Sequence, residues 1–472
     1  MAEEVWSDDL EPDPDGEQFE LEQRNSLRRV AGMSTQLTDI TEVEYRELQL
    51  ERVVLVSVWT TGSEVDAENS LAELKLLAET AGSQVLEGLV QRRSSPDPAT
   101  FIGRGKVDEV RQVVVETGAD TVICDGELEP AQLRNLEDRV GVKVVDRTAL
   151  ILDIFAQHAR SAEGKAQVEL AQLQYLRQRL RGWGGNLSRQ AGGRAAAGAG
   201  IGGRGPGETK IEIDRRRIKT RIATLRRRLR ELDAVRVTKR SGRRRNQVPS
   251  VAIVGYTNAG KSSLLNRLTG AGVLVEDALF ATLDPTTRRA ETADGREFTL
   301  TDTVGFIRHL PHDLIEAFRS TLEESVEADL LLHVVDGSDP DPFGQIRAVH
   351  EVLADIGAGG VAEQLVVNKI DRAAPDVLLA LRGSHPDAVF VSARTGEGIG
   401  ELRERLETRL PRPGMEVRAL VPWDRGDLID RIHRSGELVS SEHTAAGTLV
   451  VARVNSDLGG ELARYAVSEE PR

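Results

Sequence analysis

One short stretch near the middle of the chain constrains its fold more than any other feature. Residues 251–263 read as an apolar strand, a glycine-rich loop and the start of a helix. The loop has the spacing Gly255-x-x-x-x-Gly260-Lys261-Ser262, which wraps backbone N–H groups around a polyphosphate at a helix N-terminus. A chance glycine-rich turn would not place strand, loop and helix in this order. We therefore predict a phosphate-binding loop made by Gly255, Tyr256, Thr257, Asn258, Ala259, Gly260, Lys261 and Ser262.

Two side chains of this loop have specific expected roles. The Lys261 ammonium group should reach the β and γ phosphates, and the Ser262 hydroxyl should bind Mg²⁺. A bound nucleoside triphosphate with Mg²⁺ is therefore the expected ligand and cofactor.

The composition is that of an ordinary globular protein of several domains. The chain has 472 residues, enough for roughly three or four domains of typical size. Its single cysteine, Cys124, excludes an internal disulfide and a thiolate metal cage, and its apolar neighbours predict that it is buried. No apolar run reaches the ~20 residues of a membrane-spanning helix. The acidic first residues do not resemble a signal peptide, so we expect a cytoplasmic protein.

Charge is distributed unevenly along the chain. The net charge is −14, which by itself argues against a nucleic-acid partner. Residues 177–245, however, contain 22 Lys and Arg but only five Asp and Glu. This strongly basic segment within an acidic chain predicts a polyanionic partner.

The chain before the basic segment divides into a tail and a small domain. Residues 1–40 are acidic with little to bury, so we expect a disordered tail, either without a specific role or masking the basic segment. Residues 41–160 alternate strand-like and helical runs, which predicts an α/β domain with a small parallel sheet. Its motif Phe101-Ile-Gly-Arg-Gly-Lys106 fits either a plain helical turn or a backbone–phosphate contact.

Residues 161–245 are expected to form a long antiparallel coiled-coil hairpin. The second helix, from Glu208, has apolar residues spaced four, three, four and three apart, which is the seam of a two-helix coiled coil. Residues 182–207 contain eleven glycines together with Trp183, Arg194 and Arg204. We predict a cationic tip that orders on RNA, with a disordered linker as the alternative. Residues 240–245 read as a basic linker to the next domain.

Residues 249–411 add further nucleotide-binding motifs to the phosphate loop. Asp302-Thr303-Val304-Gly305 follows an apolar strand, where the carboxylate can hold Mg²⁺ through water and the Gly305 N–H can meet a γ-phosphate. Residues 412–472 then alternate strand and helix signals that predict a small α+β domain. The eight histidines are scattered, and their spacing predicts no metal site.

A second pair of motifs predicts selection of guanine. Asp371 can accept hydrogen bonds from N1–H and the exocyclic amine of guanine, which adenine cannot satisfy. Asn368 would help to fix the base, Lys369 would lie along its face, and the Ala393 N–H would meet O6. Asn-Lys-Ile-Asp alone could be a surface turn, but all the motifs in this order predict a guanine-nucleotide site. The expected base contacts come from Asn368, Lys369, Ile370, Asp371, Ser392, Ala393 and Arg394.

The motif set resembles the translation-factor-type GTPases and, through its flanking segments, the HflX family of ribosome-associated GTPases. The stretches that carry this resemblance begin at Phe101, Asp125, Asp146, Ala159, Gly205 and Phe280. The resemblance as a whole covers residues ~50 to ~460. The resemblance implies that Thr282 is the switch I threonine that binds Mg²⁺ when GTP is bound. It also implies that Asp302 and Gly305 belong to switch II. The switch I residues expected at the site are Phe280, Ala281, Thr282, Leu283 and Asp284.

The resemblance implies a GTPase that converts GTP and water to GDP and phosphate, with Lys261, Thr282 and Gly305 as catalytic residues. Phe306 stands where many GTPases have a water-orienting glutamine. It either swings away while another group acts, or hydrolysis waits for a partner, or it is a plain core residue. The implied partners are the 50S subunit, the 70S ribosome and ribosomal RNA, and the implied result is ribosome splitting under stress. The alternatives are a large-subunit assembly factor and a GTP-gated hibernation-type switch; we expect a monomer when free.

Overall fold

The computed structural model describes residues 52–180, 206–245, 248–270, 279–292, 295–308, 311, 314, 318–412 and 414–467. These residues belong to one compact unit that spans Glu47–Arg472. The expected acidic tail and the glycine-rich tip up to residue 205 lie outside the described residues, so both expectations stay predictions.

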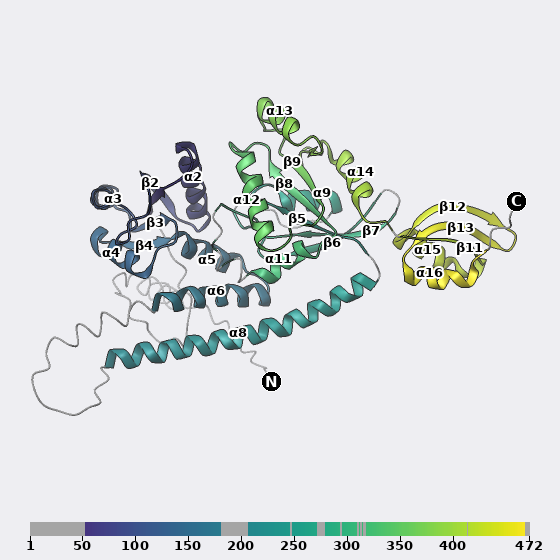
Figure 1. Ribbon diagram of the computed structural model, residues 1–472, viewed down its shortest axis with the longest axis horizontal. Coiled ribbons are helices and arrows are strands. Elements are labelled where there is room, and N and C mark those ends of the chain that lie inside the picture. Colours follow the sequence, from purple (N-terminus) through teal and green to yellow (C-terminus); the bar gives the residue numbers. More distant parts are fainter. Residues whose placement is uncertain are drawn as a thin grey trace, which may run out of the picture. The chain divides into compact units, whose positions relative to one another are not determined.

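The first part of the chain forms a four-stranded parallel sheet with helices between its strands (Figure 1). The strand order is β2-β1-β3-β4, and the register pairs Val53 with Thr121 and Thr121 with Lys143. The predicted parallel sheet is therefore confirmed. Its elements are β1 (Arg52–Trp59), α2 (Glu64–Thr80), β2 (Gln84–Arg92), α3 (Arg104–Thr117), β3 (Thr121–Asp125), α4 (Pro130–Val140) and β4 (Lys143–Asp146).

Alternate residues of β1 face two different apolar cores. Val54 and Val56 belong to a core shared with α3 and α4. Val53 and Leu55 belong to a larger core that continues into the nucleotide-binding part of the chain. A strand buried on both faces explains the unbroken run of valine and leucine in β1. Cys124 is fully buried, as predicted.

In the part of the chain that the structure describes, three helices follow this sheet. They are α5 (Arg147–His158), α6 (Ala162–Leu180) and α8 (Pro206–Arg245). α6 and α8 pack against each other in opposite directions, since Arg215 donates to the Leu180 carbonyl at 2.6 Å while Arg221 pairs with Glu169 at 2.5 Å. The seam residues Ile218, Ile222 and Leu225 of α8 are buried.

The expected linker at residues 240–245 is instead the last part of α8. This prediction was wrong, because the helix continues through Ser241 and Gly242 to Arg245. One glycine costs a helix only about 1 kcal/mol, and the arginines around it are good helix formers.

A six-stranded sheet forms the centre of the nucleotide-binding part, in the order β10-β9-β8-β5-β7-β6 (Figure 1). All neighbours are parallel except β6 and β7. The loops after β5, β7 and β9 therefore leave the same edge of the sheet, where α/β folds bind ligands. The elements are β5 (Ser250–Gly255), α9 (Lys261–Thr269), β6 (Thr286–Glu291), β7 (Glu297–Asp302), α11 (Arg319–Val326), β8 (Leu330–Asp336), α12 (Pro342–Asp355), β9 (Glu363–Asn368), α13 (Pro375–Ser384), β10 (Val389–Phe390) and α14 (Ile399–Arg409).

The last part of the chain is an antiparallel sheet in the order β11-β13-β12, with helices packed on it. Its elements are β11 (Met415–Val421), η2 (Trp423–Arg425), α15 (Gly426–Ser435), β12 (Glu437–Thr444), β13 (Gly447–Val454), α16 (Ser456–Leu462) and η3 (Ala463–Tyr465). The architecture is thus mixed α/β followed by α+β. Among the residues that the structure describes, no helix combines the length and apolar character needed to cross a membrane.

Candidate nucleotide-binding site

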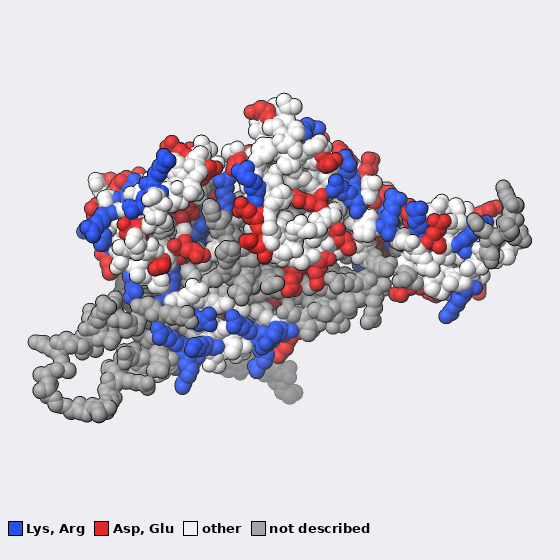
Figure 2. All heavy atoms as spheres, in the orientation of Figure 1, with Lys and Arg blue, Asp and Glu red and all other residues white. Residues whose placement is uncertain are grey.

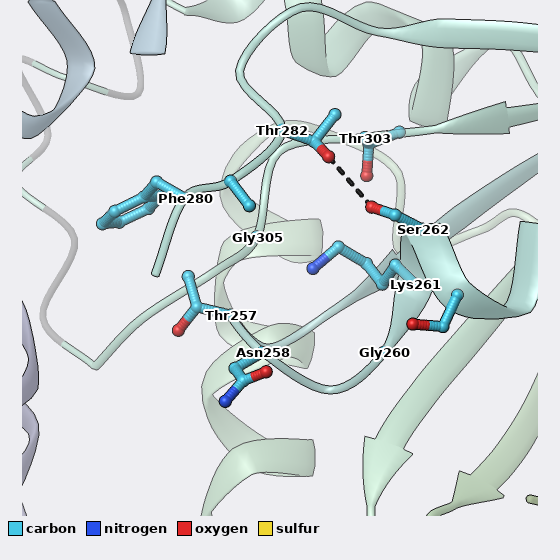
Figure 3. Close-up of a pocket in the computed structure, with 11 residues that line it drawn as sticks. Thr257, Asn258, Gly260, Lys261, Ser262, Phe280, Thr282, Thr303 and Gly305 are labelled. Atoms are coloured by element: carbon cyan, nitrogen blue, oxygen red, sulfur yellow. Dashed lines mark hydrogen bonds between the residues drawn. The ribbon is translucent and has the colours of Figure 1, made fainter. Parts of the chain in front are cut away.

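The phosphate loop connects the end of β5 to the start of α9 and lines a pocket (Figure 3). Lys261 points into this pocket, is buried, and donates a hydrogen bond to the Tyr256 carbonyl at 2.9 Å. Burial lowers the pKa of Lys261 to about 8, against the opposing effect of the Asp302 carboxylate. The pocket is lined by Thr257, Asn258, Gly260, Lys261, Ser262, Ser263, Phe280, Ala281, Thr282, Thr303 and Gly305.

The loop after β7 lies directly against the phosphate loop. The Thr303 hydroxyl donates to the Ile253 carbonyl at 2.7 Å and ties the two strand ends together. A Cβ added at Gly305 would lie 2.8 Å from Thr257 Cα and 2.9 Å from Lys261 Nζ. Only glycine fits there, so the Gly305 backbone approaches the pocket where a terminal phosphate would lie.

Three oxygen donors converge beside this pocket. Ser262 Oγ lies 2.9 Å from Thr282 Oγ1 (Figure 3). Asp302 Oδ2 lies 2.5 Å from Ser262 Oγ and 3.2 Å from Thr282 Oγ1. Burial raises the pKa of Asp302, while Lys261 and both hydroxyls oppose that rise. Asp302 Oδ1 is buried and has no hydrogen-bond partner in the described part of the chain. Hard oxygen donors with an unsatisfied carboxylate oxygen fit a hydrated Mg²⁺ ion.

The predicted base-binding residues lie together at the ends of β9 and β10. Asn368 donates to the Ala259 carbonyl at 2.9 Å and accepts from the Ala393 N–H at 3.0 Å, so it links the phosphate loop to the Ser392–Arg394 turn. The Ala393 N–H, expected to meet O6, is thus given to Asn368 in this structure. Asp371 accepts from Ser392 at 2.7 Å and pairs with Arg394 at 2.6 Å. The Ser392 hydroxyl, followed by the Arg394 charge, holds the pKa of Asp371 below its usual value, so the carboxylate stays ionised.

Two other residues of this group have contacts that motif spacing did not predict. Lys369 has a positive φ of 61° and pairs with Asp336 at 2.7 Å. The Ile370 N–H donates to the Val391 carbonyl at 3.3 Å. Both contacts hold the turn after β9 against its neighbouring strands.

Phe306 is part of the core. It is 1% exposed, its N–H donates to the Gly255 carbonyl at 3.1 Å, and its carbonyl accepts from the Thr257 N–H at 2.8 Å. Its backbone therefore extends the strand pairing between the two phosphate-binding loops. Of the three interpretations of Phe306 given above, the one that treats it as a plain core residue agrees with this packing.

The switch I residues divide between the pocket and the core. Ala281 and Thr282 line the pocket, whereas Leu283 is buried in the apolar core. Phe280 also lines the pocket, but its ring is directed away from Lys261 (Figure 3). The ring packs edge-on against Phe155 of α5, with ring centroids 4.7 Å apart. Asp284 does not line the pocket and bonds to the chain just before α6 instead.

The motifs did not predict a cluster of buried polar side chains that lies behind the phosphate loop. The Tyr256 hydroxyl donates to Glu73 of α2 and accepts from the Arg308 N–H at 2.7 Å. Arg147 pairs with Glu73 and with Asp125, the latter at 2.7 Å, and donates a hydrogen bond to the Arg308 carbonyl at 2.8 Å. Burial, followed by the nearby Glu73 carboxylate, raises the pKa of Tyr256, so the phenol stays protonated. The partners are far apart in sequence, so no local motif could reveal the cluster.

The structure brings two of the scattered histidines together, which their spacing did not predict. His333 and His350 both bond to Glu363, at 2.7 Å and 3.0 Å. Burial opposes ionisation of Glu363, but the hydrogen bonds from both histidines hold its pKa well below the usual value. Ligand atoms of these three side chains lie within 4.8 Å of one another, a spacing that could also hold a metal ion, so the expectation that the histidines form no metal site stays a prediction.

Three known protein families match most of the chain between residues 68 and 369. The families described as "GTP-binding GTPase N-terminal", "GTP-binding GTPase Middle Region" and "50S ribosome-binding GTPase" match residues 68–156, 158–243 and 250–369. "GTPase HflX" of Lacrimispora saccharolytica is 47% identical over 92% of this chain and 99% of the relative. "GTPase HflX" of Escherichia coli is 46% identical over 81% of this chain and 88% of the relative.

Solved structures are similar as well. The GDP complex of SsGBP has a TM-score of 0.42 and 27% identity, and it covers 76% of this chain and 98% of that one. The sequence relatives, matched over nearly their full length, decide the question of family. The chain is a GTPase and belongs to the HflX family.

Proposed function

We propose that this GTPase binds the large ribosomal subunit in its GTP state and splits stalled or idle 70S ribosomes. The observation that carries the proposal is that Thr282 of switch I reaches the oxygen donors of Ser262 and Asp302. A switch residue at the metal site makes the local conformation depend on the γ-phosphate and its Mg²⁺. The match of residues 250–369 to the family described as "50S ribosome-binding GTPase" supports the choice of partner.

In the proposed reaction, water attacks the γ-phosphorus and the bond to the β–γ bridging oxygen breaks, which gives GDP and phosphate. Lys261 would neutralise the β and γ phosphates, and the Gly305 N–H would donate to a γ-phosphate oxygen. Bound Mg²⁺ would supply positive charge to the β and γ oxygens, with Ser262 and Thr282 as ligands and Asp302 acting through water. No described side chain stands out as a general base. Phe306, at the position where many GTPases have a glutamine that orients the water, is buried. We therefore expect slow hydrolysis that accelerates on the ribosome.

Guanine would be recognised by the Asp371 carboxylate, which the Ser392 hydroxyl and Arg394 keep ionised. In this proposal Asn368 holds the base-binding turn to the phosphate loop rather than reading the base alone, since its amide and carbonyl are both engaged. Binding of the phosphates would therefore stabilise the base-binding turn, and binding of the base would stabilise the phosphate loop.

The charge of α8 supports a ribosomal RNA partner. Among residues 213–232, the part of this helix whose side chains the structure describes, eight basic side chains and one acidic one, Glu231, are exposed. Figure 2 shows basic side chains gathered along this helix. Phosphate-rich RNA is the polyanion that a long basic helix suits. A protein that binds ribosomes in this way would act in the cytosol.

Sucrose-gradient sedimentation of 70S ribosomes with this protein tests the proposal. With a non-hydrolysable GTP analogue we expect 70S particles to separate and the protein to migrate with 50S, whereas GDP leaves 70S intact. Thr282→Ala removes the switch I hydroxyl that contacts Ser262 and Asp302. With the GTP analogue this variant should leave 70S intact, as the parent protein does with GDP. Intact 70S under every condition would reject splitting.

Two outcomes would favour the other functions. Preferential binding to immature large particles over 70S would indicate an assembly factor. Tight GTP-dependent binding without stimulated turnover would indicate a binding switch, which the burial of Phe306 favours among the alternatives.

A further inference from the structure

The segment that carries Thr282 also holds the start of α6. Asp284 Oδ2 accepts from the backbone N–H groups of Arg160 at 3.1 Å and Ser161 at 2.7 Å. Asp284 Oδ1 accepts from the Ser161 hydroxyl at 2.5 Å. One side chain of switch I thus satisfies three donors that lie more than a hundred residues away in the chain.

Asp284 and Ser161 together cap α6. The Ser161 hydroxyl accepts from the Gly164 N–H at 2.8 Å, which is the arrangement of a helix N-cap. The Asp284 carboxylate places a negative charge at the positive end of the helix. A Cβ at Gly164 would lie 2.4 Å from Asp284 Oδ1, so the close approach requires glycine there. Ser161, Gly164 and Asp284 therefore form one fitted contact.

Thr282 and Asp284 connect this cap to the nucleotide site. Thr282 lies 2.9 Å from Ser262 at the metal donors, and Asp284 follows two residues later, within about 7 Å of chain. Leu283 between them is buried, and Phe280 is fixed against Phe155. A displacement of Thr282 cannot be absorbed by slack in so short a segment, so it reaches Asp284.

Helix α6 connects the capped end at Ser161 to the basic helix α8. It has 19 residues, which gives a length of about 28 Å. Arg221 of α8 pairs with Glu169 of α6, and buried residues of α8 line the contact between the helices. The start of α6 is therefore the base of the arm that would face RNA.

We propose that Asp284 is a positioning residue that passes the nucleotide state from switch I to α6. With GTP bound, Thr282 is held at the metal site and Asp284 caps α6. After hydrolysis the segment is released and α6 loses its cap. The consequence for ribosome binding rests on the proposed function, but the capping itself does not. The regulated element is the base of the arm, not the basic surface.

Hydrogen exchange of the full chain tests the capping step. Amides of residues 160–170 are compared with GDP and with a non-hydrolysable GTP analogue, both at saturating concentration. In the parent protein we expect exchange about fivefold or more slower with the analogue. In Asp284→Ala it should be equally fast with both nucleotides. An undiminished nucleotide difference in this variant, or no difference in the parent, overturns the proposal.

Further variants separate the cap from general damage. Asp284→Asn keeps the shape and removes the charge, and it serves if the alanine variant does not fold. Ser161→Ala removes the cap from the α6 side and should reduce the nucleotide difference in the same segment. Ser63→Ala is the matched control, because it removes an N-cap hydroxyl from α2, where it bonds Asp66. Loss of the difference in this control as well would make the effect non-specific and reject the proposal.

Ribosome co-sedimentation completes the test. The quantity is the ratio of ribosome affinities with the GTP analogue and with GDP. Asp284→Ala should reduce this ratio about fivefold or more, and Ser63→Ala should leave it unchanged. If the parent protein itself shows a ratio of one, the proposed function fails while hydrogen exchange still decides the role of Asp284.

Discussion

Lys261 donates its hydrogen bond to the Tyr256 carbonyl at 2.9 Å and is buried where phosphates would bind. Burial lowers its pKa to about 8, so near pH 8 about half of the side chains are neutral. A bound triphosphate favours the charged form and raises this pKa. GTP binding should therefore take up about half a proton at pH 8, and affinity should fall as the pH rises from 7 to 9.

Titration calorimetry in two buffers of different ionisation enthalpy measures this uptake. Lys261→Arg is the control, because its guanidinium stays charged and should bind without taking up a proton. Equal enthalpies in both buffers for the parent protein at pH 8 would contradict the prediction.

Asp371→Asn should exchange the base preference. The amide cannot accept from both N1–H and the amine of guanine, and it leaves a donor facing a donor. One unsatisfied polar group costs about 1–3 kcal/mol, so we expect GTP affinity to fall about five- to 150-fold. Xanthosine triphosphate, which has an oxygen in place of the amine, should bind the variant better than GTP. Competition against a fluorescent nucleotide checks this, and unchanged preference would remove Asp371 from the base site.

Phe306→Gln should not create a faster GTPase. The backbone on both sides of this residue is tied to Gly255 and Thr257, so the new amide would be buried away from the γ-phosphate. We expect unchanged intrinsic turnover and a loss of about 3 kcal/mol or more in unfolding free energy, as for a buried aromatic removed from a core. Single-turnover hydrolysis and urea unfolding measure the two effects. A clear rise in turnover would show that this side chain can reach the nucleotide.

Glu73→Gln should destabilise the protein through the cluster behind the phosphate loop. It removes one partner of the buried Arg147 charge and of the Tyr256 hydroxyl, which costs about 3 kcal/mol. Glu79→Gln on the same helix is the control, because its pair with Lys75 is exposed and contributes less than about 1 kcal/mol. Equal urea midpoints for both variants would argue against a structural role of the cluster.

Arg227→Ala with Arg228→Ala should weaken ribosome binding and flatten its salt dependence. Both side chains are exposed on α8, and each lost phosphate contact reduces the slope of log affinity against log salt by about one. Arg288→Ala with Arg289→Ala removes the same charge from β6 and should have little effect. Identical slopes for the parent and the α8 variant would exclude this part of the helix from the RNA contact.

The sequence predicted the parts of the fold that depend on local patterns. The strand, loop and helix around Lys261 agree with the structure because apolar runs and glycine spacing are local signals. The end of α8 was wrong because a single glycine does not stop an arginine-rich helix. Helices α11, α12 and α13 were not predicted, because they lie between the nucleotide-binding motifs and carry none of them.

The candidate site was predictable where its residues belong to compact motifs. The contacts of Tyr256 with Glu73 and of Asp284 with Ser161 were not, because the partners are 183 and 123 residues apart. Neither pair has an identifying spacing, although Ser161 lies within a stretch that carried the family resemblance. The histidine pair at Glu363 was missed for the same reason. Long-range polar contacts depend on how sheets and helices stack, which no single segment encodes.

Phe155 packs edge-on against both Phe280 and Phe318, with centroids 4.7 Å apart in each pair. A fragment cut at residue 248 would present the last two rings to water and would be prone to aggregate. Inhibitor screens on such an excised piece would sample a surface that the whole protein never displays. Recombination that exchanged the chain on only one side of residue 248 would disturb the same contacts. The segments that carry Phe155 and the pair of rings Phe280 and Phe318 should therefore be inherited together.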